Sequence, residues 1–216
     1  MSGSVFIDLT HSLGPRPPVF PGDDPAGLVQ VRRIERDGFC DFRLETGLHV
    51  GTHLDGAMHR VAGRSPLSSY PLERFVGRGQ VIDCSGRGAI CLLDQEAGRL
   101  APGDFVLFYT GHDRHYGAEG YFTEHPVMTP ECAAQLIARG VGLVGLDTPS
   151  PDRPPYAIHQ ALLGADVLIL ENLTRLQELL GATGVRVFAL PIKVEADSAL
   201  VRAIAELPVG DRSVLA

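Results

Sequence analysis

The sequence predicts a mixed α/β fold, in which helices flank a mixed sheet. Short aliphatic runs bounded by Gly, Pro or Asp recur along the chain, which is the pattern of strands. In the second half these runs alternate with helical patterns, which favours strands that are partly buried on both faces. We find no fixed-period repeat or low-complexity linker in the 216 residues, so we predict one domain over 1–216.

The predicted strands begin close to the first residue. The cleanest alternation lies within 42–49, where Phe42 and Leu44 share one face and Arg43 and Glu45 share the other. Other strands are identified as aliphatic runs between turn residues. The expected strands cover 5–9, 28–35, 42–49, 80–84, 104–110, 141–147, 166–171 and 185–190.

Helices are expected mainly in the second half of the chain. Thr129-Pro130-Glu131 begins one helix, because Thr caps free amides, Pro suits the first helical position and Glu suits the positive end of the helix dipole. Gly140 ends that helix. Further helices are expected at 156–163 and 174–180, and a helical or irregular segment at 198–206.

Composition excludes several classes of protein. A net charge of −7 argues against non-specific nucleic-acid binding, and no apolar run reaches the roughly 18 residues of a membrane helix. The first residues lack the basic and apolar regions of a signal peptide. The four cysteines form no CxxC motif, which favours reduced thiols in a cytoplasmic protein, with Cys40 and Cys132 packed in the core.

A cluster of histidines carries the strongest chemical signal. Three of the 8 histidines fall within residues 49–59. Neutral imidazole and ionised carboxylate bind Zn²⁺ and related divalent ions, so His49, His53 and Asp55 are candidate ligands. The alternative is a loop of solvated histidines, but clustered imidazolium cations repel each other and a metal removes that conflict.

Two residues far from this cluster are further candidate ligands. His159 lies in a predicted short helix, and Glu171 follows a buried aliphatic strand, where a carboxylate usually has a charge partner or a metal. Taken alone, each is more simply explained as an ordinary structural side chain.

The histidine stretch resembles the hallmark of the cyclase family, His-x-Gly-Thr-His-x-Asp-x-x-x-His. Further segments of the chain resemble that family in the same order, among them Phe20-Pro21-Gly22-Asp23 and Leu170-Glu171-Asn172-Leu173. Within the family, the sequence is similar to the bacterial kynurenine formamidases. Every fixed position of the hallmark is matched, at His49, Gly51, Thr52, His53, Asp55 and His59.

The resemblance implies a swivelling β/β/α fold, a homodimer and two divalent metal ions in each subunit. Zinc is the expected metal, and Mn²⁺ and Co²⁺ accept the same ligands. One ion is expected on His49, His53 and Asp55. The other is expected on Asp55, His159 and Glu171, with Asp55 bridging. His59 is expected to be the general acid and base.

The chain departs from the formamidase pattern around the expected substrate pocket. Phe20 stands where these relatives carry Trp, and the whole chain has no Trp. His112 follows Gly111 where many relatives have Trp, and the segment between Ser150 and His159 is shorter. Phe20 still offers an aromatic face for stacking on an aryl ring, but a smaller one without an N–H donor.

These residues predict metal-dependent hydrolysis of an aryl formamide, namely N-formyl-L-kynurenine to L-kynurenine and formate in tryptophan degradation. Hydrolysis of isatin or another cyclic or aryl amide is the first alternative. A non-catalytic metal-binding protein is the second, although such a protein has no need of His59. A cysteine hydrolase is disfavoured, because Cys84 and Cys91 have no nearby histidine. The roles of His112, His115 and His125 stay open between a pocket loop and the surface.

Overall fold

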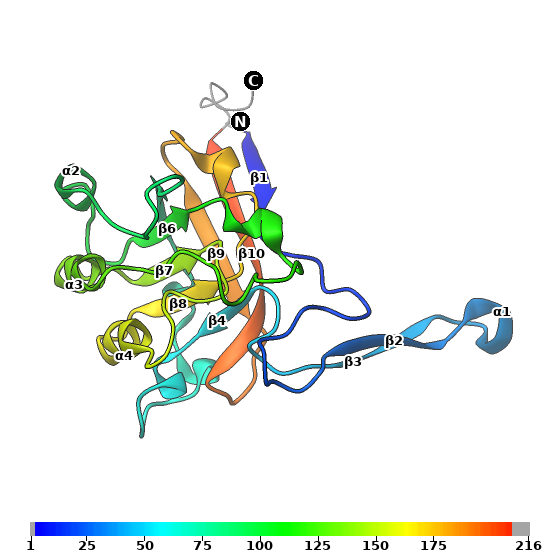
Figure 1. Ribbon diagram of the computed structural model, residues 1–216. Coiled ribbons are helices and arrows are strands. Elements are labelled where there is room, and N and C mark those ends of the chain that lie inside the picture. The colour runs from blue at the N-terminus through cyan, green and yellow to red at the C-terminus, as the bar shows by residue number, and fades with distance from the viewer. Residues whose placement is uncertain (1–2, 209–216) are drawn as a thin grey trace.

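The computed structural model describes residues 3–208 and centres on a mixed sheet that closes on itself. The strand order is β1-β10-β4-β8-β7-β6-β5-β9, and β9 also pairs with β10, so seven strands form a barrel-like ring with β1 added outside it (Figure 1). This confirms the mixed α/β prediction. The strands of this sheet are β1 (Ser4–Asp8), β4 (His53–Asp55), β5 (Val76–Asp83), β6 (Phe105–Tyr109), β7 (Leu143–Leu146), β8 (Leu168–Glu171), β9 (Arg186–Pro191) and β10 (Ser198–Pro208).

Half of the ring is parallel and carries the helices. Strands β5, β6, β7 and β8 run parallel, whereas β4 is antiparallel to both β8 and β10. The crossovers contain α2 (Asp94–Ala97), α3 (Pro130–Ala138) and α4 (Ala157–Gly164), which lie together on one side of the sheet in Figure 1. Parallel strands require such crossovers, and the burial of all four residues of β7 and of β8 follows from cover on both faces.

Two hydrophobic cores result from this arrangement. Leu54, Leu107 and Leu170 belong to the core on one face of the sheet, together with apolar residues of β10. Val144 and Ile169 point to the opposite face and pack with residues of α3 and α4. The alternation along each strand therefore divides its side chains between the two cores.

The helix predictions are partly confirmed. α3 begins as expected, since the Thr129 hydroxyl accepts a hydrogen bond from the Cys132 amide. The helix predicted at 174–180 is only a 3₁₀ turn at Leu176–Leu179. The 198–206 prediction was wrong, because this segment is β10. Its alanines suit a helix, yet Val201, Ala203 and Ala205 are buried at every second position, which is the period of a strand.

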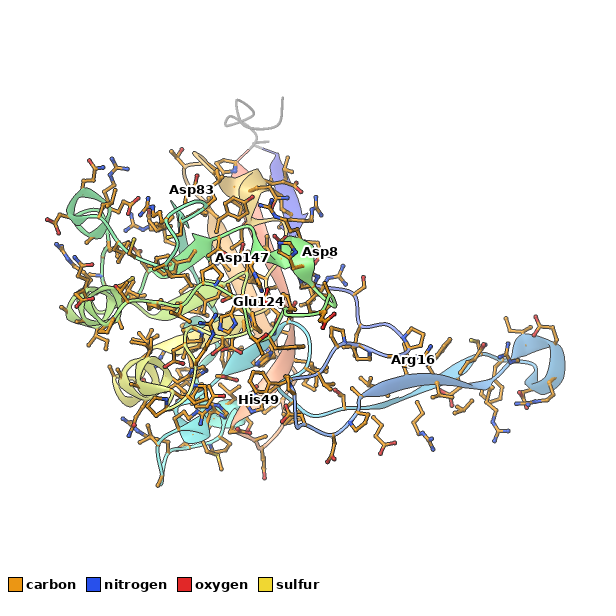
Figure 2. The ribbon with its side chains drawn as sticks, in the orientation of Figure 1. Asp8, Arg16, His49, Asp83, Glu124 and Asp147 are labelled. Carbon is orange, nitrogen blue, oxygen red and sulfur yellow. The ribbon has the colours of Figure 1, made fainter. Side chains whose placement is uncertain are left out.

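A two-stranded arm leaves the body of the protein. It contains β2 (Gly27–Arg32), the single-turn helix α1 (Ile34–Asp37) and β3 (Asp41–Glu45), so the strands predicted at 28–35 and 42–49 are shorter than expected. Figure 2 shows side chains leaving the arm on both sides, away from the barrel. The apolar face predicted for 42–49 is uncovered within the described chain, with Phe42 53% exposed.

The cysteine predictions divide between these two regions. Cys132 is buried in α3, as expected. Cys40 is exposed, so its predicted place in the core was wrong, because it lies on the arm next to β3. Within residues 3–208, no helix has the length and apolar character needed to cross a membrane.

Candidate metal centre

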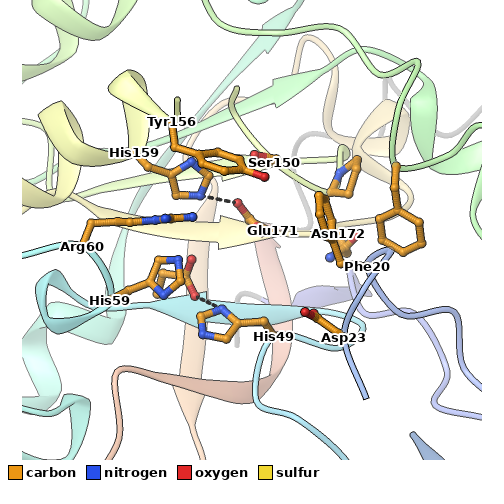
Figure 3. Close-up of a pocket in the computed structure, with 13 residues that line it drawn as sticks. Phe20, Asp23, His49, His59, Arg60, Ser150, Tyr156, His159, Glu171 and Asn172 are labelled. Atoms are coloured by element: carbon orange, nitrogen blue, oxygen red, sulfur yellow. Dashed lines mark ion pairs between the residues drawn. The ribbon is translucent and has the colours of Figure 1, made fainter. Parts of the chain in front are cut away.

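The five predicted ligands come together around the paired strands β4 and β8. Strands β4 and β8 pair antiparallel with His53 opposite Glu171, and Asp55 follows two residues later on β4. His159 is reached from α4, and His49 from the loop before β4. Figure 3 shows His49, His159 and Glu171 facing a shared pocket.

Donor atoms from these side chains approach one another closely. His49 Nδ1 lies 3.0 Å from Asp55 Oδ1, and His53 Nε2 lies 3.7 Å from the same oxygen. Glu171 lies between His53 and His159. Its Oε2 lies 3.2 Å from His53 Nε2 and its Oε1 lies 3.2 Å from His159 Nε2.

Several of these buried atoms make no hydrogen bond within residues 3–208. They are His53 Nε2, Glu171 Oε1 and both carboxylate oxygens of Asp55. When His53 is neutral and donates from Nδ1 to the Gly51 carbonyl at 2.8 Å, its Nε2 keeps a lone pair that faces carboxylate lone pairs. Such a group of acceptors is unfavourable by itself, and a divalent cation fits it. Without a metal ion, Glu171 and Asp55 raise the pKa of His53 against the effect of burial. Gly51 makes the turn possible, since its φ of 65° is in the left-handed region.

His159 is held by a second carboxylate outside this group. Its Nδ1 lies 2.5 Å from Asp152 Oδ1, and Asp152 Oδ2 accepts a hydrogen bond from the Ile158 amide at the start of α4. A carboxylate on the far ring nitrogen is the usual partner of a metal-binding histidine, because it fixes the tautomer and the ring orientation. His159 Nε2 is thereby directed at Glu171.

The local charges shift the pKa values of this cluster. Burial alone lowers the pKa of His49, but the interactions of its ring with the Asp55 and Asp197 carboxylates outweigh burial and raise the pKa to about 9. Burial also lowers the pKa of His159, but its interactions with Asp152 and Glu171 are stronger and raise that pKa to about 9. In the ion-free protein, protons on these rings therefore offset the carboxylate charge, and a divalent ion has to displace them.

The predicted acid and base, His59, lies beside the donors. It ends the 3₁₀ turn Ala57–His59, and its ring centroid is 4.3 Å from that of His49. Burial lowers the pKa of His59 in spite of the charge on Asp55, so the ring is neutral at pH 7. Ligand atoms of His59, Asp55 and His159 lie within 4.8 Å of one another, which places His59 next to the predicted ions.

Two carboxylates were missed from the sequence. Asp152 precedes His159 by seven residues and lies in a Pro-rich turn. An acidic residue just before the helix that carries a candidate histidine ligand is the signal that would have identified it. Asp197 contacts both His49 and His59 at 3.0 Å. It lies directly before β10, and the helical interpretation of that segment concealed it.

The pocket beside the donors has aromatic walls. Its volume is about 270 Å³, and Phe20, Phe122, Tyr156 and Arg60 are among its lining residues. Phe20 and Phe122 meet edge to face at 5.6 Å, and the Arg60 guanidinium lies 4.5 Å above the Tyr156 ring. An adjoining apolar cavity of about 250 Å³ shares the three aromatic residues. Phe20 therefore lines the pocket, as its position in the sequence suggested.

The other candidate residues lie outside the cluster. His112 and His125 are buried and His115 is exposed. His112 Nε2 lies 2.8 Å from the Tyr121 carbonyl. Burial raises the pKa of the Cys84 thiol to about 11, so a nucleophilic thiolate is disfavoured there at neutral pH.

Solved structures of hydrolases share this architecture. An isatin hydrolase bound to the product analogue thioisatinate is 22% identical with a TM-score of 0.84, over 95% of this chain and 93% of that one. Isatin hydrolase A from Labrenzia aggregata, bound to benzyl benzoate, is 26% identical with a TM-score of 0.83, over 95% and 94%. A protein described as a predicted metal-dependent hydrolase from Bacillus stearothermophilus is 24% identical with a TM-score of 0.76, over 95% and 99%.

The fold is one that hydrolases adopt, and the donor cluster at its site could hold a metal ion. The sequence also matches the family described as "Putative cyclase" over residues 7–153. That match covers more than half of the chain, so the protein belongs to the cyclase family.

Proposed function

We propose that this protein hydrolyses an amide whose nitrogen is attached to an aromatic ring, with the help of two divalent metal ions. The observation that carries the proposal is a group of potential ligand atoms beside a pocket with aromatic walls. Atoms of His53, Asp55 and Glu171 in this group have no hydrogen-bond partner among residues 3–208. The donors suit a Lewis acid, and the walls suit an aryl group.

We assign the metal ligands as the resemblance implies. His49, His53 and Asp55 hold one ion, and Asp55, His159 and Glu171 hold the other. Zn²⁺ is the expected metal, and Mn²⁺ and Co²⁺ accept the same donors. Divalent ions at such sites lower the pKa of water and stabilise negative charge on a carbonyl oxygen.

His59 supplies the proton transfers. Its ring is neutral at pH 7, so it can accept a proton from the attacking water. As the C–N bond breaks, the leaving nitrogen needs a proton, and the same ring returns it. One residue thereby serves as base and then as acid.

The substrate is expected to be an anilide that carries a carbonyl group beside its nitrogen on the ring. Isatin and N-formyl-L-kynurenine both have this chemistry. Water opens isatin to isatinate, and it cleaves N-formyl-L-kynurenine to L-kynurenine and formate. Isatin is supported by the fold of two isatin hydrolases, one of which is 26% identical. N-formyl-L-kynurenine is supported by Arg60, whose cationic group lines the pocket and suits an amino-acid carboxylate.

Turnover of both compounds tests the function. The protein is stripped with a chelator, reloaded with Zn²⁺ or Mn²⁺, and assayed on isatin and N-formyl-L-kynurenine side by side. We expect turnover that requires the metal, with His53→Ala as the inactive control. Full metal content with no turnover of either compound would instead support a non-catalytic metal-binding protein.

A homodimer is the expected assembly, and the arm offers a surface for it. An isolated hairpin is at best marginally stable in water, and the apolar side chains of Phe39, Phe42 and Ile34 are more than half exposed on this one. A second copy of the chain would cover them.

A further inference from the structure

Asp197 connects two histidines of the candidate site. Its Oδ2 lies 3.0 Å from His49 Nε2 and 3.0 Å from His59 Nδ1. The Asp197 carbonyl also accepts a hydrogen bond from the Gly56 amide at 2.9 Å, which fixes the residue beside the histidine motif. The carboxylate therefore contacts a predicted metal ligand and the predicted acid and base at the same time.

These contacts determine where the neutral rings carry their protons. A carboxylate oxygen only accepts hydrogen bonds, so the ring nitrogen that faces it must be the protonated one. Nδ1 of His49 also faces a carboxylate, that of Asp55 at 3.0 Å, so without an ion both of its nitrogens favour a proton. With a metal ion on Nδ1, the one proton left on His49 is on Nε2, toward Asp197. His59 carries its proton on Nδ1, which leaves Nε2 free as a proton acceptor.

We propose that Asp197 is a positioning residue for the hydrolysis proposed above: it holds His59 with Nε2 unprotonated and orients His49 with Nδ1 toward the metal. The inference rests on the proposed function for its catalytic part only. The orientation of the two rings is a property of the protein that can be measured without substrate.

A different role for Asp197 is also testable. Ligand atoms of His49, His59 and Asp197 lie within 4.8 Å of one another, so these residues could themselves surround an ion. Hydrogen-bonding geometry favours positioning, because both nitrogen–oxygen pairs have the distance and direction of ordinary hydrogen bonds. His49 moreover turns its other nitrogen toward Asp55.

The tautomers can be read directly by nitrogen NMR of the zinc-loaded protein with ¹⁵N-labelled histidine. His59→Gln assigns the signals of His59 by their loss. In the unmodified protein, we expect the proton of neutral His59 to be on Nδ1. In Asp197→Ala, we expect a mixture of the two tautomers, because the carboxylate that favours the proton on Nδ1 is gone. A proton on Nε2 in the unmodified protein, or a zinc-bound Nδ1, would overturn the proposal.

Zinc binding and kinetics provide the second test. Asp197 is about one-third exposed and its carbonyl contact does not involve the side chain, so Asp197→Ala should fold. We expect a 10–100-fold loss in kcat with little change in KM, and zinc affinity about 10-fold weaker in competition with a chromophoric chelator. Asp197→Asn, which keeps one acceptor oxygen, should recover part of both losses.

Glu195→Ala is the matched control, because it removes an exposed acidic residue from the same loop. Loss of a whole zinc equivalent in Asp197→Ala would make Asp197 a ligand and overturn the positioning role. Identical behaviour of Asp197→Ala and Glu195→Ala would also overturn it. If neither candidate substrate is turned over, the NMR signals and zinc affinity still decide the role of Asp197, whereas the proposed function fails separately.

Discussion

His53 and Glu171 face each other across the antiparallel pair β4 and β8, with His53 Nε2 3.2 Å from Glu171 Oε2. The pairing register alone brings together two residues that are 118 positions apart in the sequence. Neither side chain reaches solvent to a significant extent, so the interaction of these two groups is weakly screened. This pair gives the first prediction.

Glu171→Gln should remove most of the stabilisation that zinc gives to the fold. A ligand that binds only the folded state raises its stability in proportion to RT ln(1 + [L]/Kd), so a weakened site gives a smaller rise. We expect a large increase in Tm on adding Zn²⁺ to the unmodified chain and a much smaller one in the variant. Glu178→Gln, at a partly exposed residue of another segment, is the control. Equal zinc-induced shifts in both variants would remove Glu171 from the metal site.

His59→Asn tests the proton transfers. A positioned acid and base contributes about 10²–10⁴-fold to the rate, so kcat should fall by that factor while metal content stays at the value of the unmodified protein. Metal analysis and kcat at saturating metal are measured on the same sample. A loss of metal that excess zinc reverses together with activity would instead identify His59 as a ligand.

Phe20→Ala should weaken binding of an aryl substrate. The ring of Phe20 lines both the pocket and the adjoining cavity, and its removal costs on the order of 1–3 kcal/mol of stacking and burial. We expect a higher KM for isatin and N-formyl-L-kynurenine and a smaller change in kcat. Met58→Ala, at a residue that is 44% exposed, serves as the control. An unchanged KM for every aryl amide would exclude Phe20 from substrate binding.

His125 should make the fold less stable in acid. Burial, assisted by the charge on Arg153, lowers the pKa of His125 to about 4, below the ordinary value of 6.5. The unfolded chain therefore binds a proton below pH 6.5 that the folded chain accepts only near pH 4. Above pH 6.5 the ionisation of His125 therefore does not reduce the free energy of unfolding. As the pH falls from 6.5 toward 4, the free energy of unfolding decreases by on the order of 3 kcal/mol.

His125→Phe keeps a ring of similar shape and removes the titration. Urea unfolding of both chelator-treated proteins at pH 7.5 and at pH 4.5 measures the difference. The variant should lose less stability on acidification than the unmodified chain, since the other titrating groups are common to both. Equal losses would mean that His125 does not contribute to the acid sensitivity.

Charged substitutions on the arm should separate the proposed dimer. Phe39→Asp with Phe42→Asp places two carboxylates on a surface that we propose a second copy covers. Sedimentation should then give the mass of one chain. Leu72→Asp is the matched control, because Leu72 is 69% exposed on the body of the protein. A dimer that persists in the double variant would place the interface elsewhere.

Local sequence was enough to predict the elements and donors that depend on short-range chemistry. The cap of α3 at Thr129 needs only neighbouring residues, and the spacing of His49, His53 and Asp55 already indicated a metal. His159 and Glu171 were identified mainly through the family resemblance. Only the tertiary structure brings them close to the histidine motif, and local sequence does not show that contact. Their roles, like the single domain over 1–216 and the cytoplasmic location, stay predictions.

The failures arose where tertiary contacts override local preference. β10 is rich in alanine, which favours helices, but three neighbouring strands provide its hydrogen bonds. The alternation of Phe42 and Leu44 correctly indicated a strand, yet it could not show that the strand would lie on an arm that residues 3–208 leave uncovered. β4 is only three residues long, which is too short for a periodic signal.

The place of β10 in the ring has a consequence for biosynthesis. Asp197 and the strand that closes the barrel leave the ribosome about 140 residues after the histidine motif. The Ser198 hydroxyl lies within hydrogen-bond distance of the carbonyls of Leu48 and Leu54, between which its one proton is shared, so β10 also contacts the backbone on both sides of His53. A nascent chain that already contains the histidine motif therefore still lacks β10 and Asp197, which contact the motif in the complete fold. If these residues hold a metal ion as proposed, we expect its capture to be coupled to completion of the fold, and fragments that end before residue 197 to bind the metal weakly.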